Sequence, residues 1–446
     1  MTEVGLKLEW EWEAAPTVQA PEHRATWARV EIRAGDQWAT LVEDRASGSA
    51  RRSIYCPLYP LAEWVAYNWW FLQADSRPAK VLGRMTELGT GGFTNLPRIQ
   101  RDRHSVRASG DGFAWPDLWI VPEGNQWTRL SWLPDSVANP DWPITFISWG
   151  DLRVDSYSVT LELGRMVSGV ITRLKEQGIN GTSLEKEWIE ILQTDEEEAE
   201  YCKAAARLGL DPYSMPEEYE STILRAAEAL PTGVFGDLVD AADPGSLSLS
   251  LDWIIRLSEE IRSLPVSLAG RLEIAGLNDG VDQSLGRADQ PWELGWAQAR
   301  RLRVASRVGP LDKFKIDNYV SSVHRESPDS ELLVLGGTNE HGIPVAALGR
   351  RTGVSAQRFS LARSMWHFVW EPGHYFVVTG AYTDRLKTER AFAAELLAPA
   401  AGIAERLGVD PRYATEEDLE EVAGHYGVQP LLISHQVRNQ LMSREA

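Results

Sequence analysis

Cysteine is almost absent from this chain of 446 residues, in which only Cys56 and Cys202 occur. Two cysteines cannot form a disulfide framework in a chain of this length, which favours a reducing compartment. No apolar run approaches the roughly 18–20 residues that a membrane-spanning helix needs. The first residues lack the basic segment and the apolar stretch of a secretory signal. These absences predict a cytoplasmic protein that does not enter a membrane.

Positive charge is also in short supply. The 45 Lys and Arg residues against 64 Asp and Glu give a formal net charge of −19. This balance argues against a phosphate-binding surface that extends over the whole chain. The acidic excess is concentrated in residues 151–250, with 20 acids and 8 bases, whereas residues 1–150 have 18 acids and 15 bases. We interpret the acidic middle as a solvated face; a basic partner or nucleic-acid mimicry is the alternative.

The common catalytic signatures are missing from the sequence. It contains no G-x-G-x-x-G after a strand, no G-x-x-x-x-G-K-[ST], no G-x-S-x-G and no C-x-x-C. The glycine-rich stretch Gly89–Gly92 has no lysine or helix cap placed for a phosphate, so we predict a loop there.

Tryptophan marks the N-terminal third, because thirteen of the 19 indoles lie before residue 151. Apolar residues alternate in Leu6–Trp12 and Ala28–Ile32, and glycine-rich turns separate such segments. One helix is expected over Leu61–Trp70. We therefore predict a Trp-rich, mainly antiparallel β domain over residues 1–152. Its indoles form an aromatic core or, as the alternative, a platform that stacks bases, sugars or a peptide.

The hydrophobic period becomes helical after residue 153 and mixed after residue 289. Helix caps at Thr182 and Asp195 and the stop at Gly209 predict an acidic α-helical domain over 153–288, with a weak joint at Ala275–Pro291. The third domain, 289–446, combines helices with strands at Leu332–Gly337 and Pro344–Leu348. The predicted fold class is therefore α+β multidomain.

Three segments of the C-terminal third resemble ImmA/IrrE-type zinc metallopeptidases. Gln357–Trp370 is similar to that family's active-site helix, R-F-T-L-A-H-E-x-x-H, and Arg390–Pro399 to its A-N-x-F-A-A-x-L-L-x-P helix. Asp418–Val428 with His435–Leu441 resembles the helical pair that closes such domains. The resemblance covers about residues 290–446. It implies an α+β metallopeptidase-like domain that binds zinc through two histidines and a carboxylate.

The chain departs from this family's pattern at the zinc ligands. Arg363 stands at the first histidine and Ser364 at the general base, and His367 alone keeps its type. A gapless alignment puts Thr388 at the position of the third ligand, with Glu389 one residue further on.

A permanently charged guanidinium repels a divalent cation, and loss of the general base costs on the order of 10² to 10⁴ in rate. We therefore expect a pseudopeptidase without catalytic residues and without zinc or another cofactor. Arg363 is expected to pair with Glu389 or Glu395, either as an internal staple in place of zinc or as an anion site for a ligand or partner tail. His367 is expected to be a buried, satisfied histidine; a weak alternative is a displaced metal site of His367, Glu371 and His374.

A local cluster of cations offers a candidate contact with nucleic acid or another anion. It consists of Arg98, Arg101, Arg103 and Arg107, and a second group follows at Arg300, Arg301 and Arg303. Intrachain pairing or a solvated face is the competing interpretation for both groups.

Taken together, the sequence predicts a non-catalytic regulatory or scaffold protein that acts with a protein partner. Members of the resembled family act beside regulators in stress responses, toxin–antitoxin pairs or phage defence, so the resemblance implies such a setting. The alternatives are a zinc peptidase with relocated ligands and a nucleic-acid-linked binding module.

Overall fold

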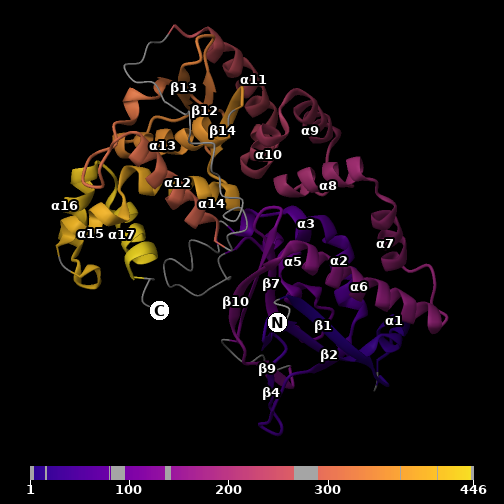
Figure 1. Ribbon diagram of the computed structural model, residues 1–446. Helices are drawn as coiled ribbons and strands as arrows, with labels where there is room; N and C mark the ends of the chain where they lie inside the picture. Colours follow the sequence, from indigo (N-terminus) through magenta and orange to yellow (C-terminus); the bar gives the residue numbers. More distant parts are fainter. Residues whose placement is uncertain are drawn as a thin grey trace. The chain divides into compact units, whose positions relative to one another are not determined.

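The computed structural model describes residues 5–15, 18–79, 81, 96–135, 142–265, 290–371, 373–408 and 410–442. The chain divides into two compact units, Met1–Met215 and Pro216–Ala446, called here the first and the second unit. Each unit combines helices with β-sheet, so the protein is a multidomain α+β protein, as predicted (Figure 1). Among the described residues, no helix is both long and apolar enough to cross a membrane.

The first unit contains antiparallel sheets among its described residues. One sheet has the order β1-β2-β3, with β6 also paired to β2; the others have the orders β10-β8-β7 and β5-β4-β9. Its strands are β1 (Leu6–Trp12), β2 (Trp27–Ala34), β3 (Gln37–Trp38), β4 (Val42–Asp44), β5 (Ala50–Arg51), β6 (Ile54–Pro57), β7 (Asp117–Pro122), β8 (Trp127–Leu133), β9 (Ile144–Phe146) and β10 (Gly150–Asp155). Antiparallel sheet in this part of the chain agrees with the sequence-based prediction.

Helices pack on these sheets and account for much of the first unit. They are α1 (Pro21–Ala25), α2 (Tyr59–Tyr67), α3 (Trp69–Ala74), α5 (Arg98–His104), α6 (Ser156–Glu176), α7 (Ser183–Gln193) and α8 (Glu196–Leu208). The helix expected over Leu61–Trp70 is two helices, because the chain leaves helical geometry at Asn68. The predicted caps hold: Thr182 accepts a hydrogen bond from Glu185 N and Asp195 accepts one from Glu198 N.

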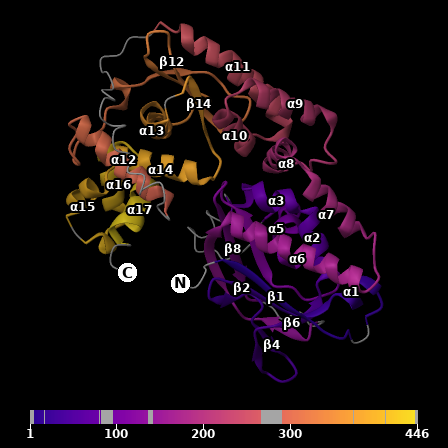
Figure 2. The same ribbon diagram turned by 45° about the vertical axis from the view of Figure 1, so that its right-hand side comes forward.

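Helix α6 lies alongside β1 in both ribbon views (Figures 1 and 2). Glu162 of α6 accepts a hydrogen bond from the backbone N–H of Leu8 at 2.6 Å, and Arg165 donates to the carbonyl of the same residue. These side chains therefore occupy hydrogen-bonding groups that a further strand would use. Gly169 lets the backbone of α6 approach Trp10, because a Cβ there would lie 2.7 Å from the indole.

Several indoles of the N-terminal third belong to the core, in agreement with the aromatic-core interpretation. Trp115, Trp119 and Trp132 are at most 1% exposed, whereas Trp149 is 69% exposed. Several half-buried indoles are covered by a guanidinium: Arg165 over Trp10, Arg173 over Trp12, Arg52 over Trp38 and Arg153 over Trp127. The arginines shield faces on which a base or a sugar would otherwise stack, which disfavours the platform alternative.

The second unit is built around a sheet of order β11-β13-β12-β14, in which β11 and β13 are parallel and the other pairs antiparallel. Its strands are β11 (Ser321–His324), β12 (Leu332–Thr338), β13 (Pro344–Leu348) and β14 (Tyr375–Thr379). Its helices are α9 (Glu217–Ala229), α10 (Thr232–Ala241), α11 (Leu247–Ser263), α12 (Pro291–Ala305), α13 (Val354–Trp370), α14 (Asp384–Leu397), α15 (Ala400–Leu407), α16 (Glu416–Tyr426) and α17 (Pro430–Gln436). The sequence-based prediction contained β12 and β13 but neither β11 nor β14.

Helix α13 packs against this sheet, and α14 packs between α13 and α12. The α12–α14 contact is close because Gly295 of α12 has no side chain: a Cβ there would lie 2.2 Å from the carbonyl oxygen of Thr388. The apolar side chains of α13 and α14, among them Met365, Phe392 and Leu396, form the core under the sheet.

The division into two units differs from the expected three domains, 1–152, 153–288 and 289–446. Among the described residues, helices of the middle region pack on strands as well as on one another. Helix α6 packs on β1, α2 and α7, while α10 and α11 pack on β14 and β12 and also contact α9. Helix α6 therefore belongs to the first unit, and α10 and α11 belong to the second. Gly89–Gly92 and residues 275–289 of the expected weak joint lie outside the described residues.

Candidate functional site

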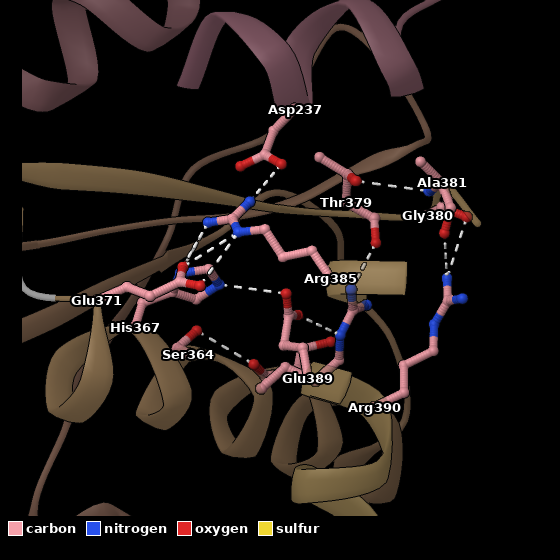
Figure 3. Close-up of polar contacts among 12 residues, drawn as sticks. Asp237, Ser364, His367, Glu371, Thr379, Gly380, Ala381, Arg385, Glu389 and Arg390 are labelled. Carbon is pink, nitrogen blue, oxygen red and sulfur yellow. Dashed lines mark hydrogen bonds and ion pairs between the residues drawn. The ribbon is translucent and has the colours of Figure 1, made fainter. Parts of the chain in front are cut away.

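The cluster predicted from the sequence lies where α13, α14 and β14 meet (Figure 3). Arg363 and His367 are one helical turn apart on α13, so their side chains leave the same face of the helix. Glu389 enters from α14 and reaches both of them. All three side chains are buried, at 2%, 1% and 0% exposure for Arg363, His367 and Glu389. Residues on two helices therefore form one compact polar cluster inside the second unit.

Arg363 is fully engaged within this cluster. Its Nε donates to Oε1 of Glu389 at 2.6 Å, and its Nη2 donates to the carbonyl oxygen of Thr379 at 2.7 Å. Burial alone would raise the pKa of Glu389, but the charge of Arg363 and the hydrogen bond from His367 lower it below its usual value. Glu389 is therefore an ionised carboxylate that faces a guanidinium.

His367 uses both of its ring nitrogens. Nε2 lies 3.2 Å from Oε2 of Glu389, Nδ1 lies 3.1 Å from Oε2 of Glu371, and the ring stacks on Phe376 at 4.2 Å between centroids. Burial opposes the charged form, but the hydrogen bonds to Glu371 and Glu389 outweigh it and raise the pKa of His367. The expectation of a buried, satisfied histidine is confirmed.

Two residues that the sequence did not single out extend the cluster. Arg385, one turn before Glu389 on α14, donates to Oε2 of Glu371 at 2.7 Å and also binds Oδ1 of Asp237 on α10. Burial opposes its charge, but the carboxylates of Asp237 and Glu371 raise the pKa of Arg385 above its usual value. The other oxygen of Asp237, Oδ2, has no hydrogen-bond partner, and burial raises the pKa of this carboxyl to about 6.

Thr388 and Ser364, by contrast, contribute nothing to the cluster. Oγ1 of Thr388 donates to the carbonyl oxygens of Pro291 at 2.9 Å and Asp384 at 3.1 Å. Oγ of Ser364 donates to the carbonyl oxygen of Ser360 at 3.1 Å. The gapless alignment pointed to Thr388, but the side chain that reaches the cluster is that of Glu389, one residue later. Glu389 lies on the face of α14 that is turned toward α13.

These donors do not fit a zinc ion. Glu371 and Glu389 bind opposite nitrogens of His367, so they cannot share one ion with it, and the cation Arg363 lies against Glu389. His374, the third residue of the alternative site, is exposed, whereas His367 is buried. Among the described residues, no three His, Cys, Asp or Glu side chains are placed to hold a metal. The charge that balances Glu389 is the guanidinium.

Glu395, the other acid considered for Arg363, lies in a separate network. It accepts hydrogen bonds from Arg300 at 2.8 Å, from Gln436 at 2.9 Å and from Gln440 at 2.8 Å. Arg303 is 4% exposed and donates to the carbonyl of Leu396. The basic group of α12 therefore serves packing within the second unit.

The cluster of cations at residues 98–107 is split between the surface and the interior. Arg98 is exposed and lies 3.5 Å from Asp102, and Arg101 is exposed as well. Arg103 donates to the carbonyl of Gly209 at 3.0 Å and lies over Phe71. Arg107 donates to Asp135 at 2.6 Å. Arg103 and Arg107 are half-buried and bound within the unit, so the intrachain interpretation fits these two better than a nucleic-acid surface.

Comparisons of the chain with known protein families, with curated protein sequences and with solved structures find no match. The function of the protein is therefore inferred from the geometry of the cluster.

Proposed function

We propose that this protein is a non-catalytic regulatory or scaffold protein, built on a degenerate zinc-peptidase-like domain of the ImmA/IrrE type and acting with a protein partner. The observation that supports the proposal best is the sharing of one carboxylate. Glu389 contacts both Arg363, at 2.6 Å, and His367, at 3.2 Å, which lie four residues apart on α13.

A zinc peptidase places two side chains with this spacing and a carboxylate from a second helix around its metal. In this chain the guanidinium of Arg363 provides the positive charge that the carboxylate needs. Ser364 follows Arg363, and its hydroxyl is bound to a helix carbonyl, so it offers no base to deprotonate a water. In this proposal the domain keeps the peptidase-like fold, has lost hydrolysis, and binds a protein partner.

The metal content of the purified full-length protein tests this proposal. We expect no stoichiometric zinc in the wild type, before or after incubation with zinc, and no peptidase activity. The double variant Arg363→His, Ser364→Glu restores an imidazole and a carboxylate, and we expect it to bind zinc that a chelator removes. Thermal unfolding of both proteins checks that the variant is folded. Stoichiometric zinc in the wild type, lost with proteolysis on chelation, would overturn the proposal.

A further inference from the structure

Helix α10 packs against β14 and places Asp237 beside Arg385 (Figure 3). Asp237 is 6% exposed, and among the described residues its Oδ2 has no hydrogen-bond partner. A buried carboxylate is costly unless its oxygens are satisfied. The polar contact that connects α10 to the cluster is therefore incomplete, in contrast to the saturated contact between Arg363 and Glu389.

The sequence of α10 makes it a weak helix. It spans Thr232–Ala241 and contains Gly233 and Gly236, and Pro231 at its start provides no side-chain cap. Glycine lowers helix stability by about 1 kcal/mol relative to alanine, and helices of this length are marginal on their own in water. The helical state of α10 therefore depends on its contacts with the rest of the unit.

The neighbouring helix α11 is held much more firmly. It spans 17 residues and buries a row of apolar side chains that includes Leu251, Ile254 and Leu257. Glu260 near its end pairs with Arg325. At the junction of the two helices, Asp329 accepts a hydrogen bond from Asp243 N at 2.8 Å. The chain is thus held just after α10, whereas α10 itself is held by its buried side chains Val234, Leu238 and Val239 and by Asp237.

Under α10 lies the one guanidinium of the cluster that a ligand can approach. The side chain of Arg385 is 33% exposed, whereas that of Arg363 is 3% exposed. Nε and Nη2 of Arg385 bind Glu371, and Nη1 alone binds Asp237, so a carboxylate that replaces Asp237 needs only this one donor. An anion-binding role is therefore better placed on Arg385 than on Arg363.

We propose that α10 is an autoinhibitory cover of this cluster, and that an acidic segment of the partner protein displaces it by taking the place of Asp237 on Arg385. The proposal rests on the proposed function in that the degenerate cleft binds a protein partner. Opening exposes Val234, Leu238 and Val239 of α10, and the half-satisfied carboxylate of Asp237 offsets part of the stability that their burial gives to the covered state.

Hydrogen–deuterium exchange of the full-length protein tests the cover. We expect the amides of α10 to exchange by local opening, on the order of 100-fold faster than those of α11 after correction for intrinsic rates. Asp237→Asn keeps the side-chain size and removes the charge, so it should slow exchange of α10 about tenfold. Glu228→Gln on the exposed face of α9 is the matched control and should change nothing. Equal opening of α10 and α11, or faster opening in Asp237→Asn, would overturn the proposal.

A second measurement tests the chemistry of the partner. Hexaglutamate should speed exchange of α10 in the wild type, and Arg385→Gln should abolish this effect, whereas hexalysine should have none. A wild type that does not respond to hexaglutamate would exclude an acidic competitor. None of these results depends on zinc. Metal bound to the wild type would contradict the proposed function, whereas the exchange rates alone decide whether α10 opens.

Discussion

Each unit of the protein buries one histidine beside a carboxylate and an arginine, and the two clusters differ in how they end. In the first unit, His104 binds Asp75 at 3.3 Å and the carbonyl of Ile120 at 3.0 Å. Arg77 binds Asp75 at 2.6 Å and donates to the carbonyl of Leu208 at 3.0 Å. This cluster therefore closes on backbone carbonyls and caps the C-terminus of α8.

The cluster of the second unit continues from one titratable side chain to the next. It runs from Arg363 through Glu389, His367, Glu371 and Arg385 to Asp237, where one oxygen has no hydrogen-bond partner within the described part of the chain. Buried ion pairs of similar composition can therefore have different structural roles. The first cluster connects α5, β7 and α8 and ends on backbone carbonyls, whereas the second connects α13, α14 and α10 through side chains alone at its last step, from Arg385 to Asp237.

The largest expected effect is that of Arg363→Met. The substitution leaves Glu389 buried without its guanidinium, and breaking such a pair costs about 3–5 kcal/mol. We expect urea unfolding of the second unit to be destabilised by this amount, with the first unit unchanged. Arg98→Met, at an exposed arginine, should change the free energy of unfolding by less than about 0.5 kcal/mol. An equally small effect at Arg363 would show that its ion pair with Glu389 does not stabilise the second unit.

Asp75→Asn should destabilise the first unit by about 2–3 kcal/mol, because Arg77 then loses a charged acceptor but keeps its bond to Leu208. Exchange of the amides of α8 would report the loss. An effect of Asp75→Asn on the second unit would contradict the independence of the two clusters. Unchanged exchange of α8 would contradict the role of Asp75 in holding this helix.

The smallest expected effect is the different pH dependence of the two units. The raised pKa of His367 gives stability that is present below about pH 6.5 and is lost as the pH rises through the folded-state pKa. Asp237, with a pKa raised to about 6, acts in the same direction, but most of its contribution is lost between its usual pKa and pH 6, so only the last part of the loss falls above pH 6. Hydrogen bonds from Arg77 and His104 overcome burial and lower the pKa of Asp75, so its contribution is lost only in acid.

We therefore expect the second unit to lose about 1 kcal/mol between pH 6 and pH 8, while Asp75 contributes no such change in the first. Denaturation with exchange-resolved readout at pH 6, 7 and 8 measures both slopes. His367→Gln combined with Asp237→Asn should flatten the slope of the second unit. Parallel slopes in the two units would remove the distinction between the clusters.

Local patterns made much of the fold predictable. Alternation gave β1 and β2, and cap residues gave the starts of α7 and α8. The spacing of Arg363 and His367 placed them on one face of α13, since helical periodicity is a local property. The break at Asn68 was not visible, because Leu61–Trp70 continues an apolar pattern across it.

The rest of the candidate site depends on contacts that no local pattern encodes. Arg385 lies one turn before Glu389, so helical spacing contained a signal that would have placed it on the same face. Asp237 is 148 residues from Arg385 in sequence, and a single aspartate in α10 does not reveal its partner. The correct choice between Thr388 and Glu389 required the contact of α14 with α12, which turns Thr388 toward Pro291.

The bonds from Glu162 and Arg165 to Leu8 have a consequence for the behaviour of the protein in a crowded solution. Outer strands with free amides and carbonyls invite pairing between molecules and the growth of aggregates. Side chains of α6 already satisfy both groups of Leu8, so a second molecule meets a blocked template along this part of β1. The same helix that completes the first unit therefore also protects it from self-association through this strand.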